Sequence, residues 1–202
     1  MSAVLKPIAI SISTSAFMAT FLGFADVNLI SVKFGNKFGD LFTTALKTYV
    51  SKCTGLPVGG PVVSYSTSDL QNDLYKAGKE AFTQTFQGFE DVNQLAHKFG
   101  TELKPMADII SSYMKTCMTT PAVPPAVPVS PGGPLITIPS AICVPVFLSC
   151  SQKGFMATFQ GFADTLGISV LFGTIFSTLG TEVGNYASRC KSAPGGGPLI
   201  AS

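Results

Sequence analysis

The stretch Phe17-Met-Ala-Thr-Phe-Leu-Gly-Phe-Ala-Asp26 decides the architecture, because it occurs twice more in the chain. The other copies are Phe82-Thr-Gln-Thr-Phe-Gln-Gly-Phe-Glu-Asp91 and Phe155-Met-Ala-Thr-Phe-Gln-Gly-Phe-Ala-Asp164. After each block come a Phe-Gly pair, a Tyr and a Cys, in the same order: Phe34-Gly35, Tyr49 and Cys53; Phe99-Gly100, Tyr113 and Cys117; Phe172-Gly173, Tyr186 and Cys190. Such self-similarity indicates one supersecondary unit used several times. We expect three internal repeats, at 15–53, 79–117 and 152–190, in a single domain or compact array over residues 1–202.

The spacing of apolar residues inside each copy predicts helices. In the second copy the apolar residues from Phe82 to Cys117 follow one another every three or four positions, which places them on one face of a helix. The first copy has one extra residue between Phe34 and Cys53, and four-residue steps absorb it. The fold class is therefore mainly α. The repeat core is expected to contain nine Phe residues: Phe17, Phe21, Phe24, Phe82, Phe86, Phe89, Phe155, Phe159 and Phe162.

Six glycines at equivalent places suggest where each unit bends or packs closely. Gly23, Gly88 and Gly161 lie inside the repeated block, and Gly35, Gly100 and Gly173 follow the next Phe. Because a glycine costs a helix about 1 kcal/mol relative to Ala, six of them indicate close helix approach or a bend. We expect two helices per unit with a break near the Phe-Gly pair. Pro105 would fit the first turn of a restarted helix.

Pro/Gly-rich segments link the three units. Four segments start with Pro and continue with apolar or β-branched residues: 7–11, 61–65, 134–139 and 198–202. This composition favours extended chain and short edge strands. Residues 119–134 hold six prolines and form a predicted spacer between the second and third units, and 191–202 is a predicted extended C-terminal arm. Ser68-Asp69 is a candidate helix start.

Composition excludes some classes of partner. Charged residues make up 12% of the 202 residues and apolar residues 46%, and the net charge is only +2. Nucleic acid is not expected as a partner, because phosphate binding needs clustered Lys and Arg. Residues 7–25 carry no charge, and the length of this stretch is close to that of a helix that spans a bilayer. The aligned part of the second copy carries Lys79, Glu80, Glu90 and Asp91, so membrane association is kept only as the alternative.

The five cysteines do not follow a disulfide or zinc pattern. Three of them, Cys53, Cys117 and Cys190, share one repeat position, and the chain has no Cys-x-x-Cys pair. We interpret these three as small packing residues of a protein made in a reducing compartment. A bridge between Cys143 and Cys150 remains open.

No residue pattern predicts catalysis, a metal site or a cofactor. His97 is the one histidine, and the other copies have Val32 and Val170 there, so a solvent-facing or interface contact is expected. Asp26, Asp91 and Asp164 recur in every copy, where a helix cap or a contact with a neighbouring unit is favoured over a set of catalytic carboxylates. Without a repeated acid pair or a nucleophile and base, an enzyme is not expected.

The favoured function is a non-enzymatic structural protein of a large assembly such as a virion. Such a protein would use the helical units as an anchor and the extended arms to bind neighbouring protein chains, for example by adding a strand to a sheet edge. The alternative is a membrane-associated helical protein. The residues expected to contact neighbours are apolar and lie in the arms: Pro61, Val62, Val63, Leu135, Ile136, Ile138, Leu199 and Ile200.

Overall fold

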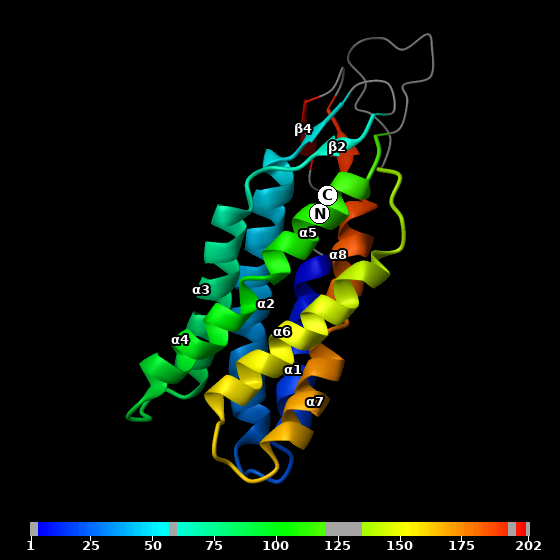
Figure 1. Cartoon of the computed structure of the whole chain (residues 1–202). Coiled ribbons are helices and arrows are strands. Elements are labelled where there is room, and N and C mark those ends of the chain that lie inside the picture. The colour runs from blue at the N-terminus through cyan, green and yellow to red at the C-terminus, as the bar shows by residue number, and fades with distance from the viewer. Residues whose placement is uncertain (1–3, 57–59, 120–134, 194–196, 201–202) are drawn as a thin grey trace.

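The computed structural model describes residues 4–56, 60–119, 135–193 and 197–200, and it confirms a mainly α protein. Helices run side by side along an elongated bundle, with short strands at one end (Figure 1). The spacer at 120–134 lies outside the described residues. The helices are α1 (Leu5–Thr20), α2 (Val27–Lys52), α3 (Thr67–Thr85), α4 (Val92–Leu103), α5 (Met106–Thr116), a short 3-10 helix (Ser140–Ile142), α6 (Cys143–Thr158), α7 (Thr165–Phe176) and α8 (Leu179–Ala187).

The main break in each repeat lies inside the repeated block, not near the Phe-Gly pair as the sequence suggested. α1, α3 and α6 end just before Phe21, Phe86 and Phe159, and the next helix begins after the Asp of the block. Gly23, Gly88 and Gly161 have φ of 98°, 104° and 95°, a region that glycine enters without steric cost. The three turns at 21–26, 86–91 and 159–164 therefore reverse the chain, and we call this end of the bundle the turn end.

The glycines of the Phe-Gly pairs lie within helices, where they allow close packing. A Cβ at Gly35 would stand 2.8 Å from the backbone nitrogen of Thr14, and one at Gly100 would stand 2.5 Å from the carbonyl oxygen of Tyr75. Gly173 approaches Leu148 of α6 in the same way. Close helix approach, one of the two expectations for these glycines, is confirmed. In the second copy α5 does restart after Pro105.

Phenylalanine rings fill the part of the core next to the turns. Phe21, Phe86 and Phe159 contact one another, with ring centroids 5.9 Å, 5.5 Å and 6.0 Å apart. One step further into the bundle, the pairwise separations of Phe34, Phe99 and Phe172 are 6.0 Å, 6.2 Å and 6.0 Å. These two layers hold one ring from each repeat. The expectation that Phe21 and Phe159 are buried is confirmed, and Phe86 is partly buried against the same core.

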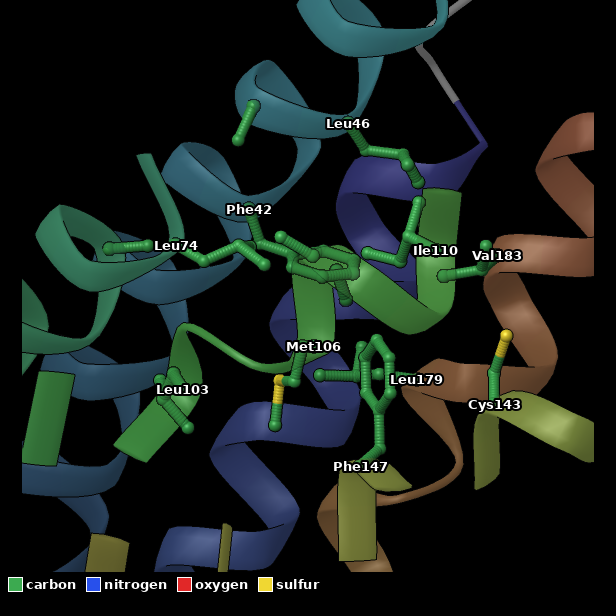
Figure 2. Close-up of a cluster of buried hydrophobic side chains, with 14 of the residues drawn as sticks. Phe42, Leu46, Leu74, Leu103, Met106, Ile110, Cys143, Phe147, Leu179 and Val183 are labelled. Atoms are coloured by element: carbon green, nitrogen blue, oxygen red, sulfur yellow. The ribbon is translucent and has the colours of Figure 1, made fainter. Parts of the chain in front are cut away.

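Beyond the Phe layers, side chains of mixed type from all three repeats continue the core. Figure 2 shows side chains of α2, α5 and α8 pointing toward one another, including Leu46, Ile110 and Val183. Phe42, Met106 and Leu179 form a neighbouring set, and all six are at most 1% exposed. Burying a side chain of this size contributes about 1.5–3 kcal/mol, so these layers supply much of the folding energy.

Short extended segments gather at the other end of the bundle, which we call the strand end. The strands β1 (Thr54–Gly55), β2 (Val62–Val63), β3 (Lys191–Ser192) and β4 (Gly197–Ile200) form one antiparallel sheet in the order β2-β1-β4-β3. Isolated bridges join Met118 to Pro61 and to Ile136. The expected extended segment at 7–11 is wrong, because Pro7 lies in the first turn of α1, where proline needs no N–H partner.

Candidate functional site

The turn end exposes three large aromatic side chains at equivalent sequence positions. Phe24, Phe89 and Phe162 are 63%, 66% and 67% exposed, so their assignment to the repeat core is wrong. Each ring packs edge-on against the inner Phe of its own turn, with centroids 5.6–5.8 Å apart. The turn reverses direction at the preceding glycine, and for this reason helical spacing does not carry these residues into the core. Phe17, Phe82 and Phe155, by contrast, are fully buried.

The surroundings of the three exposed rings differ between copies. Around Phe24 and Phe162 lie further exposed apolar residues, notably Leu22, Leu29 and Leu166. The second copy has Gln87 and Gln94 at the positions of Leu22 and Leu29. Exposed carboxylates border the turns, and none of them pairs with a cation among the described residues: Asp26, Glu90, Asp91 and Asp164. The turn end is thus apolar with an acidic border.

The arm residues expected to contact neighbouring chains are divided between core and surface. Val62, Leu135 and Leu199 are buried, and their backbone N–H groups each donate a 2.9 Å bond to a cysteine carbonyl, those of Cys117, Cys190 and Cys53. The remaining members lie at the surface: Pro61, Val63, Ile136, Ile138 and Ile200. The described parts of the arms therefore pair with the ends of this chain's own repeats, and contact with a neighbour stays a prediction.

The tyrosines of the three copies do not make the same hydrogen bonds. The Tyr49 hydroxyl donates to the carbonyl oxygen of Tyr65 at 3.1 Å, and the Tyr113 hydroxyl donates to that of Ile138 at 2.9 Å. The buried Tyr186 hydroxyl has no partner among the described residues. Burial raises the pKa of Tyr113 to about 12 and also raises the pKa of Tyr186. Both phenols remain protonated at neutral pH.

Cys53, Cys117 and Cys190 are packing residues, as the sequence predicts. All five cysteines are buried, Cys143 and Cys150 form no disulfide with each other, and Cys53, Cys117 and Cys190 are fully buried in the core. Burial raises the pKa of Cys117 to about 12 and that of Cys143 to about 11. Since the thiolate is the reactive form, these thiols are poor nucleophiles in the folded protein.

The candidate polar residues form no reaction centre within the described parts of the chain. His97 is exposed, and its Nδ1 lies 2.8 Å from the Tyr75 hydroxyl. Asp26, Asp91 and Asp164 occupy helix N-cap positions without a side-chain capping bond. Over the same residues, no group of three or more His, Cys, Asp or Glu side chains could hold a metal ion. The exposed aromatic turns are therefore the most distinctive surface feature.

Charged residues are concentrated on one side of the bundle, and this distribution was not predicted from the sequence. α1, α6, α7 and α8 contain only three charged residues, Lys6, Lys153 and Glu182, and the other charged helical residues all lie in α2–α5. α1 packs against α7, and α7 packs against α6, so these helices are contiguous. Their outward surface is called the uncharged side below. The signal was present in the charge-free stretch at 7–25 and in the absence of Lys and Arg between Lys153 and Arg189.

One stretch of the described residues, Thr165–Ala187, is long and apolar enough to cross a membrane by length and composition. It comprises α7 and α8 and belongs to the uncharged side. A core helix of a soluble protein meets the same criteria, so this single stretch is weak evidence for a membrane span. No family model, no curated protein and no solved structure matches this chain.

Proposed function

We propose that this chain is a non-enzymatic structural protein that attaches to a large assembly, such as a virion, through the exposed phenylalanines of its turn end. We infer that its body consists of three tandem copies of one helical unit, linked by Pro/Gly-rich segments, around an approximate threefold axis. The two Phe layers and the three N–H bonds to cysteine carbonyls, each with one contribution per copy, support this arrangement.

The observation that carries the proposal is the exposure of Phe24, Phe89 and Phe162. Leaving one such ring in water, rather than burying it, forgoes about 2–3 kcal/mol. The same exposed position carries Phe in all three copies. Large apolar groups gathered on a surface mark contact sites, and aromatic residues dominate the binding energy of protein interfaces.

The strand end is less suited to attachment by strand addition. The N–H groups of Val62, Leu135 and Leu199 already bind carbonyl groups of this chain, so a neighbour's strand would have to displace them. The exposed side chains of Val63, Ile136 and Ile200 remain able to contact a neighbour. They serve as a matched control, because they too lie at equivalent positions.

The experiment compares two triple variants in the cells that naturally make the protein. In one variant Phe24, Phe89 and Phe162 are replaced by Ser, and in the other Val63, Ile136 and Ile200 are replaced by Thr. We expect the wild-type chain and the Thr variant to co-sediment with large particles, and the Ser variant to stay in the supernatant with unchanged helical circular dichroism. Co-sedimentation of the Ser variant would contradict the proposal, and loss of only the Thr variant would place attachment in the arms.

A second candidate is membrane association, favoured by the apolar stretch at Thr165–Ala187. Flotation with phosphatidylcholine vesicles tests it directly. Binding that survives the triple Ser substitution would favour a lipid-facing α7 and α8 over attachment through the turns. Absence of flotation for the wild-type chain would remove this candidate.

A further inference from the structure

The uncharged side carries few charged residues between two ends of opposite charge, and the exposed apolar side chains of α6 and α7 lie in the half nearer the turn end. On α7 the residues Leu166, Val170 and Leu171 are 65%, 45% and 41% exposed, and Met156 of the neighbouring α6 is 41% exposed. Asp26 and Asp164 border this side at the turn end, whereas Arg189 and Lys191 border it at the strand end. The stretch Thr165–Ala187 between the two ends is 23 residues long, which corresponds to about 35 Å of helix.

Such a surface is self-complementary when a second copy is turned end for end. In a twofold dimer the same patch serves both subunits, and an antiparallel arrangement brings the turn end of one subunit to the strand end of the other. Asp26 and Asp164 would then lie near Arg189 and Lys191 of the second copy. A parallel arrangement would place like charges together and is disfavoured.

The two charged residues that lie between the ends of this side would also face opposite charges in an antiparallel pair. Lys153 lies in the turn-end half of α6, and Glu182 lies in α8, in the strand-end half. End-for-end pairing brings halves with opposite interior charge together. Arg189, Lys191, Asp26 and Asp164 form no ion pair within the described part of the chain, so all four can pair with another molecule.

We propose that two copies of this chain pack antiparallel through the uncharged side, with α7 and α8 of each copy at the centre and the oppositely charged ends in contact. The depletion of charge from the middle and its concentration at the border match the anatomy of protein interfaces. The helices rich in charge, α2–α5, face water. The turn ends then point in opposite directions, so one dimer presents two attachment sites.

Sedimentation velocity of the full chain between about 1 and 100 µM tests the dimer. We expect a dimer that weakens as salt rises from 50 to 500 mM, because the border charges are exposed. Replacing Leu166 and Val170 by Asp should raise the dissociation constant at least about a hundredfold. His97→Asp is the matched control, since His97 holds the position of Val170 in the second copy and lies on the charged α4. It should leave the dimer unchanged.

A charge swap separates antiparallel from parallel packing. Asp26→Lys with Asp164→Asn makes the turn-end border of the uncharged side net positive, and Asn is chosen because residue 164 has φ of 59°, which Asn tolerates. Arg189→Glu with Lys191→Glu makes the strand end acidic. Each double variant alone should be monomeric at the concentration where wild type is dimeric, whereas mixing the two, or combining all four changes in one chain, should restore dimers.

Three outcomes would overturn the inference. The first is a wild-type chain that stays monomeric at 100 µM, including one that floats with phosphatidylcholine vesicles instead. The second is a dimer that Leu166→Asp with Val170→Asp leaves intact while circular dichroism shows normal folding. The third is a failure of the combined charge variants to re-form dimers.

Discussion

The two ends of the bundle differ in what the three copies have in common. At the turn end the copies share sequence, with Gly-Phe followed two residues later by Asp in each, and the shared Phe is exposed. At the strand end the residues after each Cys differ, as Thr54, Met118 and Lys191 show, yet the backbone bonds to the cysteine carbonyls are the same. Backbone pairing tolerates changes of side chain, whereas the exposed Phe shared by the three copies is the side chain on which the proposed attachment depends.

The strongest test of the difference between buried and exposed Phe residues is to remove one ring of each kind from the same copy. Phe34→Ala should destabilise the protein by about 3–5 kcal/mol, because Phe34 is fully buried between Phe17 and Phe38. Phe24→Ala should cost less than about 1 kcal/mol, because that side chain is already mostly in water. Urea unfolding followed by circular dichroism measures both values.

Equal costs for the two alanine variants would contradict the division between core and surface. Helix propensity favours Ala over Phe at position 34 in α2 and has little influence at position 24 in a turn, so it reduces rather than produces the expected difference. A large loss at Phe24 would mean that the turn end is covered by part of the same molecule and is not free for attachment.

The sequence predicted the core where helical spacing was uninterrupted and failed where a turn intervened. The residues that start the repeated blocks, Phe17, Phe82 and Phe155, are buried as expected. Seven residues later the same spacing pointed to Phe24, but the positive φ of Gly23 reverses the chain first. A glycine in a repeat indicates either a turn or a close approach, and single-residue patterns do not distinguish the two.

Pairing at the strand end could not be predicted, because the partners lie far apart in the chain. The carbonyl of Cys53 accepts a bond from the N–H of Leu199, which links the first repeat to the last segment. Backbone bonds of this kind leave no mark on side-chain identity. The composition of the arms predicted extended chain, and only the three-dimensional arrangement supplies their partners.

A second test compares the two kinds of repeated glycine by placing Asn at each. Gly35→Asn should cost about 1–3 kcal/mol, because its Cβ would overlap backbone atoms of Thr14 and Ile10, which cannot move without shifting α1. Gly23→Asn should cost less than about 1 kcal/mol, since no atom lies within 4 Å of the added Cβ and Asn tolerates positive φ.

Thermal or urea unfolding of the two Asn variants gives the values directly. A turn-end variant that is the less stable of the two would show that the turn is packed against something. In that case close helix approach at Gly35 would not account for a cost in stability. The same would apply by equivalence to Gly100 and Gly173.

The smallest expected effect distinguishes the copies at the strand end. Tyr113→Phe removes the bond to the Ile138 carbonyl and leaves that oxygen without this donor, so it should cost about 0.5–1.5 kcal/mol. Tyr186→Phe should cost nothing measurable or stabilise slightly, because the buried Tyr186 hydroxyl has no partner among the described residues and its removal ends a desolvation penalty. The two substitutions delete the same atom from equivalent positions, which cancels differences in size and polarity. Precise urea titrations in triplicate resolve the difference, and Tyr49→Phe should fall with Tyr113→Phe. If Tyr186→Phe costs as much as Tyr113→Phe, then the Tyr186 hydroxyl has an acceptor beyond the described residues. All three tyrosine hydroxyls would then be hydrogen-bonded, and the copies would be more alike at the strand end than the described hydrogen bonds indicate.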